Sequence, residues 1–234
     1  MKHLFSFLPA ALLPLFLFAQ TWGPGTNWHY YQFEFFGDPH INTISITGDT
    51  ILDGLDAFVL SGYCYCGNPS PFLRKVGNQV YFYEGGAFYL LYDFSLNTGD
   101  TLEIFSPLYN CNGEPIRFPI DSISYSQTLG GVLLKVQHLS LEPQDNCAYY
   151  LGSSIIENIG SDNCLFPISG VCDPGTGPLL CFETADGAYY PVPADECMVA
   201  THEKTGTPSV LVSPTLFSDH FRVRSEGPSI RRIR

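Results

Sequence analysis

The segment from residue 150 to residue 165 carries the side chains best suited to catalysis. Glu157 and Asp162 flank the dipeptide Gly160-Ser161. Two carboxyl groups held roughly 5 to 9.5 Å apart can hydrolyse a glycosidic bond. A carboxylate beside a glycine turn, however, commonly accepts hydrogen bonds from backbone N–H groups. We therefore expect a structural role for both residues and keep an extracellular hydrolase acting on glycans as the alternative function.

Motifs for other kinds of catalysis are incomplete. The stretch Gly152-Ser-Ser-Ile-Ile156 lacks the last glycine of a nucleophile elbow. His202-Glu203 lacks the second histidine that a helical zinc site requires. One residue separates Cys64 from Cys66, whereas cysteine pairs in structural zinc sites usually have about two to four residues between them. We expect no catalytic residue, no metal site and no cofactor.

Aromatic residues make up 15% of the chain and often occur as neighbours. Neighbouring residues on a strand point to opposite faces, so one ring of a pair can enter the core while the other faces solvent. Exposed rings of this kind can stack on sugars. The candidates for a carbohydrate platform are Trp28, Tyr30, Tyr31, Tyr63, Tyr65, Tyr149, Tyr150, Tyr189 and Tyr190.

The charge distribution limits the class of partner. Between Gln20 and Ala200 the chain has 4 basic and 20 acidic residues, a net charge of −16. A nucleic-acid partner is therefore not expected, because phosphate binding needs a basic face. Residues 222–234 reverse the sign, with 5 Arg and a single Glu.

Residues 1–19 have the pattern of a signal peptide, with Lys2 before an apolar run that ends at Ala19. Prolines interrupt this run, which is too short to cross ~30 Å of hydrocarbon as a helix. We expect no membrane span and a secreted or cell-surface location. Export would place the 8 cysteines in an oxidising compartment, where up to four disulfides can form.

We expect at least three disulfides, one of which joins Cys181 to Cys197. These cysteines bracket a segment in which Asp186-Gly187 can reverse the chain. Closing a loop of ~15 residues would stabilise the fold by about 3 kcal/mol. The other pairings stay open, because eight cysteines allow about 105 connectivities.

The composition favours strands over helices, since Phe, Tyr, Val, Ile and Thr are common and turn-forming Gly and Pro are frequent. We predict a hairpin around Gly48-Asp49 and a single helical turn over Leu151 to Ile159. The prediction for the fold is an all-β antiparallel sandwich or open barrel of many short, disulfide-stapled strands with little helix. Further strands are expected at 28–36, 57–64, 79–83, 87–94, 102–105, 116–123, 132–141, 179–183 and 188–192.

An ordered set of strand and turn motifs resembles uncharacterised secreted proteins of the Bacteroidetes that carry a C-terminal sorting domain for type IX secretion. The resemblance covers most of residues 28–200 and implies export and a β-rich domain without an assigned activity. The matching motifs are Ile46-Thr-Gly-Asp-Thr-Ile-Leu-Asp-Gly54 with Phe58, Leu73-Arg74, Gln79-Val-Tyr81, Leu91-Tyr-Asp-Phe-Ser-Leu96, Gly99-Asp-Thr-Leu102, Ile156-Glu-Asn-Ile-Gly-Ser161 and Leu180-Cys-Phe182.

The stretch from Val210 to Val223 is similar to the beginning of the sorting domain itself. Thr215 and Leu216 replace the usual Asn and Pro, and the sequence stops at Arg234. We therefore expect a truncated domain that is not a complete sorting signal alone, so the type IX machinery is a partner only if the tail is still recognised. We also expect residues 202–234 to be dispensable for folding of the body.

These patterns predict four parts: a signal peptide (1–19), a β-rich extracellular domain (20–200), a linker (201–209) and a truncated sorting-domain-like tail (210–234). The function expected from them is a secreted or cell-surface module for binding or structure, without catalysis, with carbohydrate as the candidate ligand. A pocket with two converging carboxylates would instead favour the glycan hydrolase.

Overall fold

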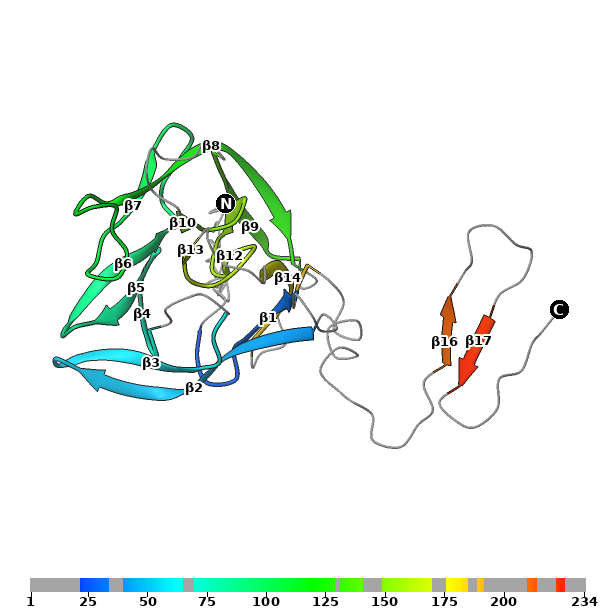
Figure 1. Cartoon of the computed structure of the whole chain (residues 1–234). Coiled ribbons are helices and arrows are strands. Elements are labelled where there is room, and N and C mark those ends of the chain that lie inside the picture. The colour runs from blue at the N-terminus through cyan, green and yellow to red at the C-terminus, as the bar shows by residue number, and fades with distance from the viewer. Residues whose placement is uncertain are drawn as a thin grey trace, which may run out of the picture. The chain divides into compact units, whose positions relative to one another are not determined.

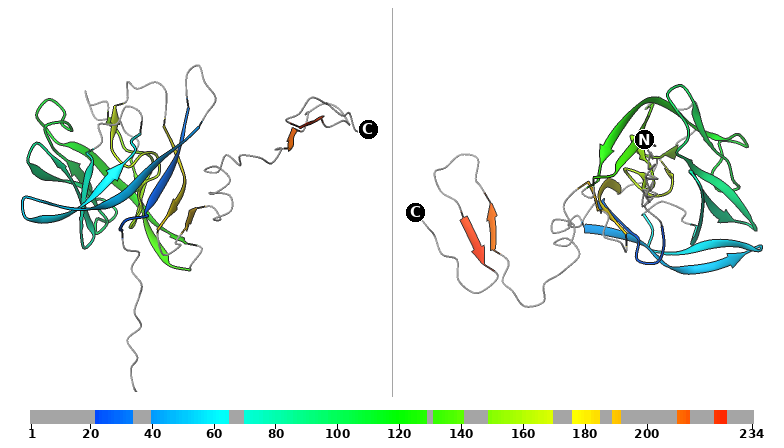
Figure 2. Two further views of the ribbon diagram at one scale, coloured as in Figure 1. Left: turned by 90° about the horizontal axis from the view of Figure 1, so that it is seen from below. Right: turned by 180° about the vertical axis from the view of Figure 1, so that it is seen from behind.

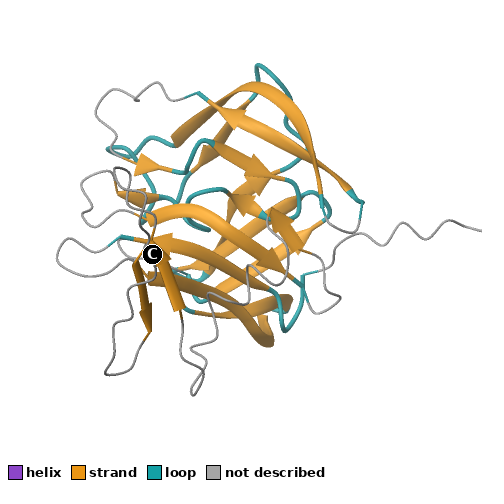
Figure 3. Ribbon diagram, turned by 90° about the vertical axis from the view of Figure 1, so that its right-hand side faces the viewer, coloured by secondary structure: helices purple, strands orange, loops and turns teal. Residues whose placement is uncertain are grey.

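The computed structural model describes residues 22–33, 40–64, 70–128, 131–140, 149–169, 176–184, 189–191, 210–213 and 222–225. The chain divides into two compact units, Met1–Cys197 and Met198–Arg234. Within the described ranges every regular element is a strand, and none is a helix that could cross a membrane (Figure 3). The prediction of an all-β antiparallel fold is confirmed.

Eight strands of the first unit form one antiparallel sheet in the order β15-β14-β1-β2-β3-β4-β5-β6 (Figure 1). Strands β1 to β6 follow one another as a meander, and β14 returns to pair with β1. The bounds are Asn27–Gln32 (β1), His40–Leu52 (β2), Leu55–Ser61 (β3), Phe72–Val76 (β4), Gln79–Glu84 (β5), Ala87–Asp93 (β6), Thr176–Glu183 (β14) and Tyr189–Pro191 (β15).

A second antiparallel sheet has the order β12-β11-β9-β8-β7, and both sheets curl into half-barrels (Figure 2). Its strands are Thr101–Ile104 (β7), Ile116–Gln127 (β8), Leu133–Leu139 (β9), Ser154–Ile156 (β11) and Gly160–Ser161 (β12). A short pair joins β10 (Tyr149–Tyr150) to β13 (Ile168–Ser169). In the second unit, β16 (Val210–Ser213) pairs antiparallel with β17 (Arg222–Ser225).

The β11–β12 hairpin is buried against the aromatic face of the large sheet. Trp28 Nε1 donates to the Ile159 carbonyl (2.8 Å), and the Tyr30 hydroxyl donates to the Ser161 carbonyl (3.2 Å). The Tyr92 hydroxyl accepts a bond from the Ser161 N–H (3.2 Å). Buried Trp and Tyr side chains need partners for their polar atoms. The backbone of the hairpin supplies these partners, so the core determines where the hairpin lies.

The prediction of a helical turn over Leu151 to Ile159 is wrong. Ile155 and Ile156 belong to β11 and pair with Gln137 and Val136 of β9. Their β-branched side chains suit a strand, and both are buried. The chain then reverses through Asn158, which has a φ of 59°. The apolar run that looked helical is therefore a tight hairpin.

The predicted turn at Gly48-Asp49 is also wrong. Strand β2 continues through both residues. Its pairing with β3 shifts in register between Ile46 and Gly48, which indicates a β-bulge there. The hairpin closes instead at Asp53-Gly54, whose φ angles are 50° and 76°. Positive φ at both central residues is the requirement of the favoured two-residue hairpin turn, which Asp-Gly meets.

Candidate functional site

A cavity of about 310 Å³ opens beside the first residues of β14. This volume lies at the lower end of the range of small-molecule sites, about 300–1,000 Å³. Strand β10 and the segment after β12 form its other walls, and the Leu179 N–H donates to the Asp162 carbonyl (2.6 Å) to join that segment to β14. The cavity is lined by Tyr150, Ser153, Asp162, Asn163, Thr176, Gly177 and Pro178.

The Asp162 carboxylate is held by three hydrogen bonds in the wall of this cavity. Oδ1 accepts one from the Ser153 N–H (2.9 Å). Oδ2 accepts one from Ser153 Oγ (2.5 Å) and one from Ser154 Oγ (2.8 Å). A carboxylate has about four acceptor positions. One position on Asp162 is therefore left for a hydroxyl or amino group of a ligand.

Gly152 makes room for this carboxylate. Its φ is 89°, a conformation that side-chain-bearing residues rarely adopt. A Cβ built at this position would overlap Asp162 Oδ1 and would lie 2.9 Å from Ser161 Oγ. Glycine therefore satisfies both the backbone angle and the close approach, and the local sequence Gly152-Ser153-Ser154 supplies the space and the donors together.

Thr176 contributes a polar atom that lacks a partner. Its Oγ1 is inaccessible to solvent and makes no hydrogen bond with any residue the structure describes. A buried polar group left unpaired costs about 1–3 kcal/mol. Thr176 lines the cavity with Asp162 and Asn163, but a ligand would reach Oγ1 only if the wall of the cavity moved on binding.

Tyr150 presents a ring at the mouth of the cavity and is 40% exposed. Partial burial, together with the negative charge of Asp162, raises the pKa of its phenol. The hydroxyl therefore stays protonated at neutral pH and can donate. Its neighbour Tyr149 makes structural contacts instead. The Tyr149 hydroxyl donates to the Leu108 carbonyl (2.9 Å), and its ring packs edge-on against Tyr109.

Glu157 and Asp162 occupy opposite ends of the β11–β12 hairpin. Glu157 lies in the turn, where Oε2 accepts a bond from the Lys135 N–H (3.0 Å). Asp162 lies level with Ser154, because its N–H donates to the Ser154 carbonyl (3.0 Å). Ser154 and Glu157 are three residues apart along the hairpin, which corresponds to ~10 Å of extended strand. Each carboxylate accepts a backbone N–H, as the structural interpretation predicted.

The other aromatic candidates are dispersed. Trp28 and Tyr30 are fully buried, and Tyr31 and Tyr190 are partly buried, whereas Tyr63 is exposed. Tyr31 is thus more exposed than Tyr30, but β1 shows no regular alternation, because Trp28, His29 and Tyr30 are buried in succession. Tyr65 and the side chain of Tyr189 lie outside the described residues, as do His202 and Glu203.

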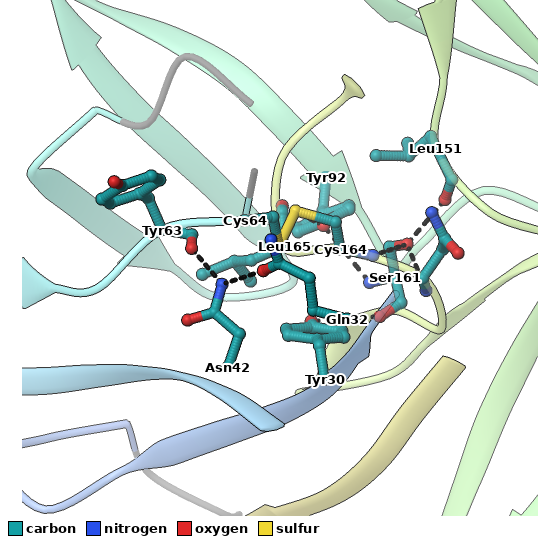
Figure 4. The surroundings of a disulfide bond; sticks show 11 residues. Tyr30, Gln32, Asn42, Tyr63, Cys64, Tyr92, Leu151, Ser161, Cys164 and Leu165 are labelled. Carbon is teal, nitrogen blue, oxygen red and sulfur yellow. Dashed lines mark hydrogen bonds between the residues drawn. A yellow bond between two sulfur atoms is a disulfide. The ribbon is translucent and has the colours of Figure 1, made fainter. Parts of the chain in front are cut away.

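A disulfide between Cys64 and Cys164 ties the end of β3 to the segment that carries Asp162 and Asn163 (Figure 4). Its two sulfurs join residues 100 positions apart, and both cysteines are buried. Cys181 is also disulfide-bonded, as is Cys111. Cys197 lies outside the described residues, so the pairing of Cys181 with Cys197 stays a prediction. Among the described residues no three His, Cys, Asp or Glu side chains gather as a metal site.

Sequence reasoning selected Asp162 and Tyr150 but missed Ser153, Asn163 and Thr176. The Ser-Ser pair after Gly152 is a signal for a carboxylate held by hydroxyls, whereas Thr176 has no local signal. Comparisons with models of protein families, with curated proteins and with solved structures found no match. The chemistry of the site therefore rests on its own geometry.

Proposed function

We propose that this chain is an exported, β-rich module that binds a neutral carbohydrate in the cavity formed by Tyr150, Asp162 and Thr176. The observation that carries the proposal is the Asp162 carboxylate, which lines the cavity with Tyr150 and accepts three hydrogen bonds from described residues, although a carboxylate has about four acceptor positions. Sugars offer several hydroxyl groups on one ring edge and an apolar ring face. The cavity has complementary groups for both.

The charge of the cavity supports a neutral ligand over an acidic one. Among the seven described residues that line the cavity, Asp162 is the one acidic residue, and none is Lys, Arg or His. The region from Gln20 to Ala200 also carries a net charge of −16. An anionic sugar would be repelled, whereas a hydroxyl can donate to Asp162 and the Tyr150 ring can lie against the sugar face.

Replacing Tyr150 tests the proposal directly. An array of neutral and acidic glycans should identify a neutral ligand, and calorimetric titration should show affinity reduced about threefold to tenfold in Tyr150→Ala, as expected for the loss of a ring contact worth about 0.5–1.5 kcal/mol. Tyr125→Ala is the matched control, because Tyr125 is 63% exposed on β8 and does not line the cavity. Binding of acidic glycans alone, or an unchanged affinity in Tyr150→Ala, would contradict the proposal.

Thr176→Val separates stability from binding. Valine keeps the shape and the strand preference but removes the unpaired hydroxyl, so thermal or urea unfolding should show a free protein about 1 kcal/mol more stable. If the wall of the cavity moves on binding and exposes Oγ1, affinity for the neutral glycan should fall by about fivefold to tenfold, because one hydrogen bond to the ligand is lost. Thr47→Val is the control, since the Thr47 hydroxyl donates to the Val59 carbonyl (3.3 Å) and Thr47 does not line the cavity. If Thr176→Val binds as tightly as the original protein, Thr176 does not contact the ligand.

Export forms part of the same proposal. It is supported by the signal-like residues 1–19, by the disulfides of Cys64, Cys111, Cys164 and Cys181, and by the resemblance to proteins of type IX secretion. Expression in a host that has this machinery should yield secreted or surface-bound protein whose N-terminus lies near Gln20. Material that stays in the cytoplasm and begins at Met1 would count against export without affecting the carbohydrate site.

A further inference from the structure

The two lysines of the first unit's described strands have contrasting environments. Lys135 Nζ donates to three oxygens of residues 95–97, at distances between 2.6 and 3.3 Å. These bonds use all three protons of its ammonium group. Lys75 Nζ makes no hydrogen bond or ion pair with a described residue and lies 5.9 Å from the centroid of the Trp22 ring. That distance is at the outer limit of a cation–π contact.

Lys75 lines a cavity of about 380 Å³ that shares no residue with the proposed carbohydrate site. The cavity forms where the β2–β3 hairpin separates from β4. Strands β3 and β4 pair only at Phe58 with Leu73 and at Val59 with Phe72, although β3 begins earlier and β4 continues further. The remaining lining residues are Asp49, Thr50, Ile51, Asp56, Ala57 and Phe58.

The surroundings of Lys75 favour an uncharged amine. Burial lowers the pKa of its ammonium group, and the carboxylate of Glu157 opposes this shift only in part. A lower pKa leaves a larger fraction of the amine uncharged near neutral pH, and only the uncharged amine is a nucleophile. Asp49 and Asp56 line the same cavity and place two acidic side chains in its wall.

We propose that Lys75 is a site of covalent aldehyde capture. The Nζ lone pair attacks the aldehyde carbon, and a proton moves from Nζ to the former carbonyl oxygen to give a carbinolamine. Loss of that hydroxyl with the second Nζ proton releases one water and leaves an imine. The step needs no oxidant or reductant. The carboxylates of Asp49 and Asp56 select an uncharged aldehyde, such as the open-chain form of a reducing sugar or a small aliphatic aldehyde.

Reductive labelling of the whole protein tests this proposal. Folded protein is incubated with glyceraldehyde or butanal and cyanoborohydride, which traps an imine as a stable amine, and peptides are quantified by mass spectrometry. Lys75 should be labelled at least about tenfold faster than Lys135, because the Lys135 amine must first break three hydrogen bonds, each worth about 1 kcal/mol. In guanidinium chloride the two lysines should react equally, because both environments are lost.

Three further arms decide the chemistry. Lys75→Arg keeps the charge but forms no imine, so labelling at position 75 should disappear while labelling of Lys135 is unchanged, and circular dichroism will show whether the variant folds. Faster labelling by glyceraldehyde than by butanal would identify a sugar aldehyde, and the reverse an aliphatic one. Glyoxylate, which carries a carboxylate, should react slowest. Equal rates at the two lysines in the folded protein, or preference for glyoxylate, would overturn the proposal.

Discussion

Removing the Cys64–Cys164 disulfide should lower the free energy of unfolding by about 3–5 kcal/mol. The bond closes a loop with a sequence separation of 100 residues, for which the chain-entropy model gives about 4.7 kcal/mol. Both cysteines are buried, so the double variant C64A/C164A also loses packing. Urea unfolding of the double variant and of the original protein, both kept oxidised, measures the difference.

The same variant should weaken the carbohydrate site, because the bond anchors the segment that carries Asp162 and Asn163. The Ser161 hydroxyl steadies this segment from the other side, since Oγ donates to the Leu151 carbonyl (2.6 Å) and accepts a bond from the Asn163 N–H (3.0 Å) (Figure 4). A single replacement is a poor control, because it leaves a free thiol. A loss of less than about 1 kcal/mol would show that the noncovalent contacts of the segment are sufficient.

Gly152→Ala should strongly disrupt the site, at a cost of about 2–6 kcal/mol. Strain at a φ of 89° contributes about 1–3 kcal/mol, and overlap of the new methyl group with Asp162 Oδ1 adds an overpacking term of about 1–3 kcal/mol. The carboxylate must move, so affinity for the glycan should fall as well. Thermal unfolding and calorimetric titration measure the two effects.

Gly48→Ala is the matched control for this substitution. Gly48 also lies in the first unit, but no atom lies within 4 Å of a Cβ built there and its φ is not in the positive range. Alanine at this strand position should therefore leave stability unchanged or slightly raised. If the two variants lose equal stability, the packing of Asp162 against residue 152 is not what requires glycine.

The fold class could be predicted because many strands show a local alternation of apolar and polar residues. In β8, Ile116, Phe118 and Ile120 alternate with exposed residues, and this period of two defines a half-buried strand. The pattern is ambiguous where both faces are covered. Ile155 and Ile156 are both buried because the β11–β12 hairpin lies inside the aromatic core, and a continuous apolar run of that length does not distinguish a strand from a helical turn.

The site was only partly predictable for a different reason. Asp162 is recognisable as a carboxylate beside a Gly-Ser turn, and Tyr150 as one ring of an aromatic pair. Thr176 is distinguished by a hydroxyl that has no partner among the described residues, and such a feature is a property of the folded chain alone. The pairing of Cys64 with Cys164 likewise depends on contacts 100 residues apart in the sequence, where no local rule applies.

Amide chemical-shift mapping shows whether the cavity beside β14 binds a neutral carbohydrate. ¹⁵N-labelled protein is titrated with the neutral glycan that binds best on the array. We expect the largest shifts at Ser153, Asp162, Asn163 and Gly177, which line the cavity, and no shift at Tyr125 and Leu133, on β8 and β9. Shifts at Tyr125 and Leu133 with none at the cavity would show that the carbohydrate binds elsewhere.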